Sequence, residues 1–156
     1  MLATAIPNHE NDFKEKKKDS NGTVFTFTET TYGSVSVCEL TPSGVSGYYY
    51  TDKVTKTGIV LHFTAGYLKG DIAALCKNDN HVSVPFVIAR DGTIYKLFDP
   101  ACWSYHLGAG SKGGNETCSK SSIAIEISNI GPLTLNGNNL MTAYNDKYCD
   151  KNETQY

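Results

Sequence analysis

The stretch Gly58-Ile59-Val60-Leu61-His62-Phe63-Thr64-Ala65-Gly66 decides the fold. Ile59, Leu61 and Phe63 fall on one face by period-two alternation, which predicts a β-strand, and the apolar content predicts that it lies inside a sheet. His62 falls on the opposite face. A buried imidazole needs a hydrogen-bond partner or a metal to offset its desolvation. From this stretch alone, a metal ligand and a core histidine bonded to a backbone carbonyl are equal alternatives.

A second predicted strand, residues 122–128, carries a carboxylate in a similar position. Glu126 lies between Ile125 and Ile127. If it is buried, its pKa is raised, as a general acid or base requires. The alternative is a carboxylate that points to solvent from a one-sided sheet. Together the two strands suggest a metal-centred hydrolytic site.

The composition narrows the class of protein. With 156 residues and a formal net charge of −2, the chain suits one domain and shows no basic patch for nucleic acid. No apolar run approaches the roughly 20 residues of a membrane span. Residues 1–7 lack the charged start and apolar core of a signal peptide. The run Lys14–Lys18 predicts a solvated, mobile arm.

The five cysteines form no C-x-x-C pair, which disfavours a zinc finger or a redox motif. Free thiols are the main expectation. One or two disulfides are the alternative, with Cys102 and Cys118 flanking one loop.

The remaining elements predict a mixed α/β sheet with flanking helices. A β-hairpin is expected from 23–28 and 34–38, a short helix at 69–77, a hairpin around Asp91-Gly92 and a loop at 104–114. A polar tail follows from 136 to 156. Residues 1–50 are expected to form an arm and hairpin extension, and residues 51–156 the main domain. One short helix cannot cover such a sheet, so an apolar face is expected to stay open and the fold to be incomplete at its C-terminus.

Three further histidines carry weaker signals. His106 lies in the segment 103–108, where an aromatic residue and a polar donor resemble a substrate-contact loop, with Trp103 stacking on a sugar or peptide. The alternative is a loop anchored by its tryptophan, with His106 incidental. His81 is expected at the surface, and His9 lies in the polar arm.

Four segments in order, 59–66, 82–95, 103–108 and 122–127, resemble the N-acetylmuramoyl-L-alanine amidases, which are zinc amidases related to T7-type lysozymes and peptidoglycan recognition proteins. The resemblance covers about residues 55–130. It implies the mixed-sheet amidase fold and one Zn²⁺ ion. It also implies His62 as the first zinc ligand and Glu126 as the catalytic carboxylate.

The resemblance makes His106 a substrate contact or a residue that supports a metal ligand, and not a ligand itself. Trp103 and Thr64 are the other expected substrate contacts. Val84 and Pro85 depart from the pair that many relatives have in that strand, which is a tyrosine or a small residue followed by a histidine.

The expected zinc site is incomplete. The family takes its remaining ligands, a His and then an Asp or Cys, from a segment after a further helix. No histidine follows Glu126 in this sequence, and Asp146, Cys149 and Asp150 lie in the polar tail. The sequence is therefore expected to be the N-terminal part of a longer amidase, and the chain alone to bind zinc weakly or not at all.

The resemblance implies a hydrolase that cleaves peptidoglycan between N-acetylmuramic acid and L-alanine, as in endolysins and other cell-wall-degrading enzymes of bacteriophages or bacteria. Peptidoglycan is the expected partner, with a virion or secretion assembly as a further one. The alternative is a non-catalytic peptidoglycan-binding or virion structural module on the same fold. A cysteine hydrolase using Cys118 or Cys102 with His106 is disfavoured, because Cys118 lies in a polar loop without an activating neighbour.

Overall fold

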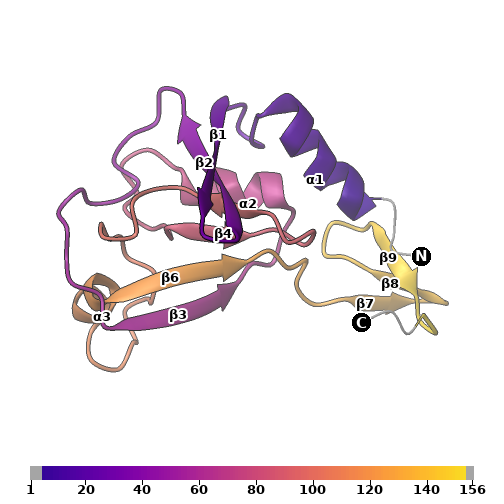
Figure 1. Ribbon diagram of the computed structural model, residues 1–156. Coiled ribbons are helices and arrows are strands. Elements are labelled where there is room, and N and C mark those ends of the chain that lie inside the picture. The colour runs from indigo at the N-terminus through magenta and orange to yellow at the C-terminus, as the bar shows by residue number, and fades with distance from the viewer. Residues whose placement is uncertain (1–4, 154–156) are drawn as a thin grey trace.

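The computed structural model describes residues 5–153 (Figure 1). Its helices are α1 (Ala5–Lys16), α2 (Leu68–Leu75) and α3 (Asn115–Ser121). Its strands are β1 (Phe25–Tyr32), β2 (Val35–Pro42), β3 (Gly58–Phe63), β4 (Phe86–Ile88), β5 (Ile94–Lys96), β6 (Ser122–Ile127), β7 (Thr134–Asn136), β8 (Asn139–Met141) and β9 (Lys147–Asp150).

Six of these strands form one mixed sheet in the order β1-β2-β5-β4-β6-β3. The pairs β3–β6, β4–β6 and β2–β5 are parallel, whereas β1–β2 and β4–β5 are antiparallel hairpins. The α/β class, the β1–β2 hairpin and the β4–β5 hairpin are thus confirmed. In the β4–β5 turn, Gly92 has a φ of 86°, a conformation that favours glycine.

Helices α1 and α2 cover one face of this sheet. The fully buried side chains Phe13 of α1 and Ile72 of α2 join Val87 and Tyr95 of the sheet in one core. Phe13 makes edge-to-face contacts with Phe25 and Tyr95, at ring-centroid distances of 5.9 and 5.6 Å. The face that carries Val60 and His62 is therefore the covered one.

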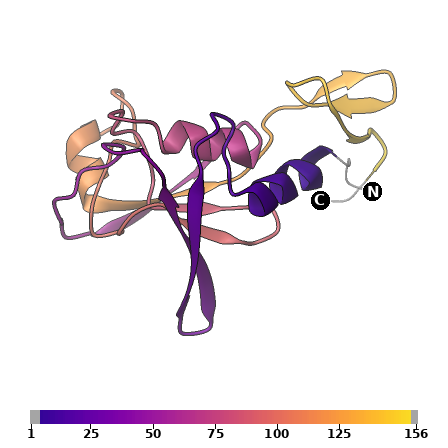
Figure 2. The same cartoon turned by 90° about the horizontal axis from the view of Figure 1, so that it is seen from above.

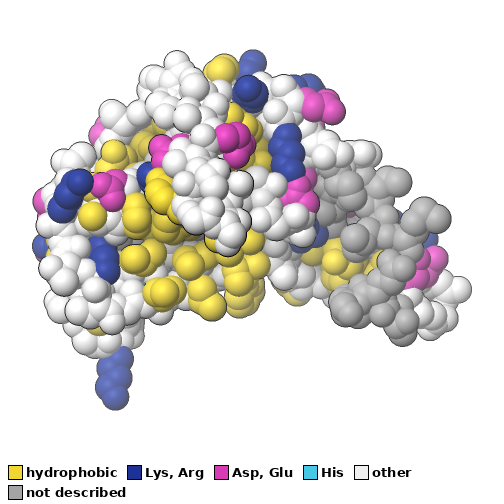
Figure 3. Space-filling view, in the orientation of Figure 1, with side chains coloured by type: hydrophobic (Ala, Val, Ile, Leu, Met, Phe, Trp, Pro, Cys, Tyr) yellow, Lys and Arg dark blue, Asp and Glu magenta, His cyan; other side chains and the backbone are white. Residues whose placement is uncertain are grey.

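The other face of the sheet is open, as the sequence predicts. Ile59, Leu61 and Phe63 are 66%, 65% and 74% exposed. Figure 3 shows hydrophobic side chains gathered over the strands labelled β3, β4 and β6 in Figure 1. On the same face, a groove of about 590 Å³ is lined by Val37, Phe86, Ile88, Ile94, Pro100 and Ile125.

The position of β3 corrects one prediction. The apolar run suggested a strand in the interior of the sheet, but β3 is an edge strand that pairs with β6 alone. Its alternation correctly assigns side chains to faces. However, the apolar side chains Ile59, Leu61 and Phe63 lie on the open face, so they are exposed.

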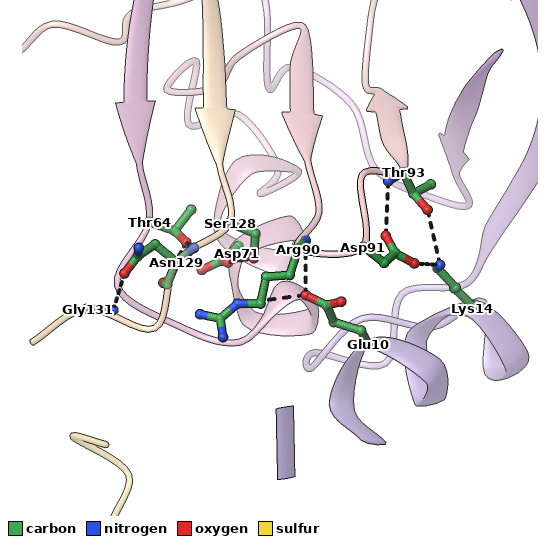
Figure 4. Close-up of polar contacts among 10 residues, drawn as sticks. All are labelled: Glu10, Lys14, Thr64, Asp71, Arg90, Asp91, Thr93, Ser128, Asn129 and Gly131. Carbon is green, nitrogen blue, oxygen red and sulfur yellow. Dashed lines mark hydrogen bonds and ion pairs between the residues drawn. The ribbon is translucent and has the colours of Figure 1, made fainter. Parts of the chain in front are cut away.

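Helix α1 corrects a second prediction, that of a mobile arm. Lys14 Nζ lies 3.1 Å from Thr93 Oγ1 and also pairs with Asp91, as Figure 4 shows. Lys69 of α2 pairs with Asp12 at 2.5 Å. The charges of this segment therefore dock the helix instead of keeping it solvated. The division of the chain at residue 50 stays a prediction, and the part of the expected arm at residues 1–4 lies outside the described residues.

The segment expected as a polar tail forms a small second sheet, β7-β8-β9, so that prediction is wrong. Cys149 is buried within it. Figures 1 and 2 place this sheet at the end of the molecule opposite α3. It contacts the main body through Tyr144, whose ring lies 5.1 Å from that of Tyr67. Helix α3 was also not expected, because its sequence is almost entirely polar.

The five cysteines are free thiols, four of them buried, which confirms the main expectation for them. Within residues 5–153, no helix is long and apolar enough to cross a membrane.

Candidate active site

The candidate site lies at the C-terminal ends of the parallel strands β3, β4 and β6. Ligands of open α/β sheets bind just outside the C-terminal ends of the strands. His62 and Glu126 are direct register partners on β3 and β6. Their side chains leave the same, covered face of the sheet from neighbouring strands, which lie about 4.8 Å apart. The structure thus brings together the two residues that the sequence singled out first.

His62 contacts His106, which comes from the loop before α3. The Nε2 atom of His62 lies 3.0 Å from the Nδ1 atom of His106. The two rings meet edge to face at a centroid distance of 5.2 Å. The expected partner of the buried imidazole is therefore a second imidazole.

A short chain of hydrogen bonds fixes the second nitrogen of His106. Its Nε2 atom lies 3.0 Å from Ser122 Oγ, and that hydroxyl donates to the carbonyl oxygen of Cys118 at 2.6 Å. Because a carbonyl oxygen only accepts, the serine proton is committed to Cys118. His106 Nε2 must then donate to Ser122, which leaves Nδ1 unprotonated and facing His62.

Burial keeps both imidazoles neutral at pH 7. It lowers the pKa of His62 from its usual value near 6.5. The pKa of His106 falls to about 4, mainly because of burial, with smaller contributions from the His62 and Lys56 charges. Neutral imidazoles are the form that binds metal ions.

Glu126 has the raised pKa that the sequence predicted. Burial, with a smaller effect of the nearby Asp71 charge, raises the pKa of Glu126 to about 7. At neutral pH the carboxyl group is therefore present in both protonation states, so it can accept a proton in one step and return it in another.

Asp71 is a site residue that sequence reasoning missed. It lies on α2, is 9% exposed, and receives a hydrogen bond from Ser128 at 3.3 Å. Burial raises its pKa to about 6. A signal was available, because Asp71 follows Leu68 by three residues and precedes Ile72, which places it on the buried face of the helix.

The loops after β3 and β6 are tied together beside Asp71, as Figure 4 shows. Thr64 Oγ1 donates to the carbonyl oxygen of Asn129 at 3.0 Å and accepts from the Asn129 amide at 2.8 Å. A Cβ atom on Gly66 would lie 2.8 Å from Asp71 Oδ1, so only glycine leaves room for this carboxylate. Thr64 directly follows β3, and its hydroxyl already binds the backbone of Asn129.

Trp103 does not offer a free stacking surface. It is 5% exposed, its ring stacks on Tyr50 at 4.2 Å, and Lys120 Nζ lies 4.6 Å from its centroid. Its indole nitrogen donates to Asp52 at 2.8 Å. The ring therefore anchors its loop, the alternative that the sequence left open. The ring of His81 stacks on the same Tyr50 at 4.1 Å.

The described residues do not form a complete zinc site. A hydrolytic zinc ion uses three protein ligands, whereas residues 5–153 contain no group of three His, Cys, Asp or Glu side chains placed to hold a metal ion. The tail residues do not supply the remainder. The Asp146 carboxylate accepts from the Tyr67 hydroxyl, and Asp150 pairs with Lys147 at 2.6 Å. A complete zinc site therefore does not fit these residues, although two imidazole nitrogens converge.

Comparison with known proteins gives one match. The family model described as N-acetylmuramoyl-L-alanine amidase matches residues 52–155, more than half of the chain. No curated protein and no solved structure matches the chain.

Proposed function

The chain belongs to the N-acetylmuramoyl-L-alanine amidase family, and from this premise we propose that it cleaves the amide between N-acetylmuramic acid and L-alanine in peptidoglycan, with Glu126 as the catalytic carboxylate. The observation that carries the proposal is the position of Glu126. It is half-buried beside His62 at the ligand-binding edge of the sheet, with a pKa of about 7.

Amide hydrolysis needs a group that moves a proton. The attacking water loses a proton, and the departing amine gains one. The ionised Glu126 carboxylate would accept the first proton and, once protonated, deliver it to the amine of L-alanine. A pKa near the working pH suits both steps.

The family resemblance implies one zinc ion, and we assign His62 as its ligand. When bound, such an ion polarises a carbonyl group and acidifies water. Since residues 5–153 contain no group of three side chains placed to hold a metal ion, Glu126 alone carries the proton transfer in this proposal.

Thr64 is kept as a proposed substrate contact because it directly follows the C-terminal end of β3. Trp103 is not retained as a stacking surface, since its ring is buried. A substrate contact by His106 stays a prediction. Both of its ring nitrogens already have partners within the protein, so a substrate would have to replace one of them. An action on the cell wall follows from the substrate class, and delivery by a phage, a virion or a secretion assembly stays a prediction.

The direct test is hydrolysis of purified peptidoglycan by the 156-residue chain, with and without added Zn²⁺. The readout is the release of peptides with a new L-alanine amino terminus. Glu126→Gln is expected to lower the rate about 100-fold or more, the usual contribution of a general base. Glu116→Gln, on the exposed side of α3, is the matched control and should keep the rate. Full activity of Glu126→Gln would contradict the role of this carboxylate.

A non-catalytic peptidoglycan-binding module is the second candidate. The observation that favours it is that His62 is hydrogen-bonded to His106 and that residues 5–153 contain no group of three side chains placed to hold a metal ion. Co-sedimentation with insoluble peptidoglycan separates the two functions. Binding without release of amino termini, at any zinc concentration, would support the binding module and reject the enzyme.

A further inference from the structure

We propose that Arg90 binds a carboxylate of the substrate peptide, so that the site prefers a peptide whose residue after L-alanine carries a free carboxyl group. An acidic residue, D-glutamate, follows L-alanine in the peptide of peptidoglycan, and its α-carboxyl group occurs either free or amidated. The inference rests on the proposed function, because it takes Glu126 to mark the position of the cleaved amide. It makes Arg90 a specificity-determining residue.

The first support is the position of Arg90, the only arginine of the sequence. It follows β4 by two residues, at the strand ends that carry the candidate site. Its Nε atom lies 3.9 Å from Glu10 Oε1 of α1, the helix that covers the face from which Glu126 projects. Figure 4 shows the guanidinium group directed toward the loops after β3 and β6. The cation therefore lies at the same end and on the same side of the sheet as the proposed catalytic carboxylate.

The distance along the sheet suits the second residue of a bound peptide. Val87 is the register partner of Glu126, and Arg90 follows Val87 by three residues, a span of about 10 Å at most. Two residues of an extended peptide cover about 7 Å. The arginine side chain is long enough to cover the difference. A carboxylate one residue beyond L-alanine can therefore meet the guanidinium group while the cleaved amide lies at Glu126.

The second support is the set of donors that the fold leaves unused. A guanidinium group has five N–H donors, and it binds a carboxylate best through two parallel hydrogen bonds. Within residues 5–153, its one ion pair is that of Nε with Glu10, and 3.9 Å is too long for a hydrogen bond. The two Nη atoms have no partner in this part of the chain. Since the Arg90 side chain is 20% exposed, these donors are accessible to a ligand.

Neutralisation of the neighbouring acids does not account for the Arg90 side chain. Burial raises the pKa of both Glu10 and Asp71, and the Arg90 charge offsets this only in part. Glu10 also accepts a hydrogen bond from the Arg90 backbone amide at 3.3 Å, which does not need the side chain. The charges of the two acids oppose an incoming anion, so the preference for a carboxylate is expected to be moderate.

The test compares two soluble fragments that differ only at the carboxyl group in question. They are N-acetylmuramoyl-L-alanyl-D-glutamate and its α-carboxamide, both with the side-chain carboxyl group of the glutamate capped as a methylamide. Affinities are measured by calorimetry in the Glu126→Gln chain, in which the fragments are expected to stay intact. The free acid is expected to bind about tenfold more tightly than the amide, as for a charge-assisted hydrogen bond.

Substitutions of Arg90, made in the same chain, assign this preference to its side chain. Arg90→Gln is expected to abolish it by weakening the binding of the free acid alone. Arg90→Lys should restore only part of it, because an ammonium group lacks the planar fork. Lys53→Gln is the matched control, since it removes a cation that is 70% exposed and pairs with Asp99. It should keep the full preference.

The side chain of Arg90 also gives a direct spectroscopic signal. Because the sequence contains one arginine, its Nε–H group gives a single, unambiguous resonance in nitrogen-15 spectra. This resonance is expected to shift on titration with the free acid and to stay in place with the amide. If Arg90→Gln does not fold, this titration still decides.

Equal affinity for the two fragments, a preference that persists in Arg90→Gln, or no binding of either fragment would overturn the proposal. Hydrolysis of peptidoglycan by the parent chain is measured separately. Binding that depends on Arg90 without hydrolysis would support the carboxylate site and reject the enzyme. Hydrolysis with equal affinity for the two fragments would reject the carboxylate site alone.

Discussion

Asp71 on α2 accepts a hydrogen bond from Ser128 at the end of β6, with 3.3 Å between Oδ2 and Oγ. This contact joins the helix that covers the sheet to the strand that carries Glu126. It also holds a carboxyl group in an almost fully buried position beside a second acid. The free energy of unfolding should therefore depend on the protonation of Asp71.

Asp71→Asn is expected to change how stability varies with pH. The folded-state pKa of Asp71 is raised from 3.8 to about 6, so the folded state binds the proton more tightly. Stability contributed by the protonated group is present below about pH 4 and is lost as pH rises through 6. At pH 7 the loss is about 3 kcal/mol, at 1.36 kcal/mol for each pKa unit. Asparagine keeps a hydrogen-bonding side chain without the charge, so the variant should gain stability at pH 7 relative to the parent chain and much less at pH 4.

Urea unfolding at the two pH values measures this difference. Glu15→Gln, which removes an exposed carboxylate of α1, is the control and should change stability equally at both. The prediction concerns the difference in free energy of unfolding between the parent chain and Asp71→Asn. If this difference were the same at pH 4 and pH 7, folding would not raise the pKa of Asp71.

Peptidoglycan hydrolysis is expected to rise with pH through about 7. The reason is that Glu126 must be ionised to accept the proton of water, and its pKa is about 7. Because the Asp71 charge contributes to this shift, Asp71→Asn should move the rising limb to lower pH. The measurement is the pH dependence of the initial rate. A rate that is flat from pH 5 to 8 would argue against Glu126 as the base.

Phe13→Ala is expected to lower the free energy of unfolding by about 3–5 kcal/mol, the usual effect of removing a buried phenylalanine. Phe13 is fully buried and contacts Phe25 and Tyr95. Phe63→Ala is the matched control. Its ring is 74% exposed, so the change should stay within about 0.5 kcal/mol. Equal effects of the two substitutions in denaturant titrations would mean that α1 is not docked.

The open face of the sheet is expected to bind a hydrophobic dye. Leu61 and Phe63 are among its most exposed side chains, and contiguous apolar patches bind such dyes and promote association. Leu61→Lys is expected to lower dye fluorescence and self-association, measured by sedimentation, without a loss of stability. Val87→Lys on the covered face should instead unfold the protein, since Val87 is fully buried.

Local patterns predicted several strands of the main sheet, and they singled out His62 and Glu126, which are register partners in the structure. Alternation located β3 and β6, and the Asp91-Gly92 turn located the β4–β5 hairpin. Periodicity assigns a side chain to a face but carries no information on a strand's place in the sheet, so the edge position of β3 was not predictable. Helix α1 was missed because Phe13 and two ion pairs dock it, whereas the other side chains described in this helix are polar or charged.

The partner of His62 could not be found from local sequence. His106 follows it by 44 residues in an irregular loop, and only the folded chain sets the direction of its ring. The same holds for Ser122, the first residue of β6, whose hydroxyl lies 3.0 Å from His106 Nε2. Asp71 was within reach, because helical spacing alone places it among buried side chains.

The edge position of β3 couples the site to local opening of the sheet. β3 is hydrogen-bonded to one neighbour, β6, so its amides are expected to exchange with solvent through fraying at a lower free energy than those of β4 or β6. His62 moves with this strand, whereas His106 is held from the other side through Ser122. The hydrogen bond between the two rings therefore ties the edge strand to the loop before α3. Loss of this hydrogen bond should lower the exchange protection of β3 more than that of β4 or β6.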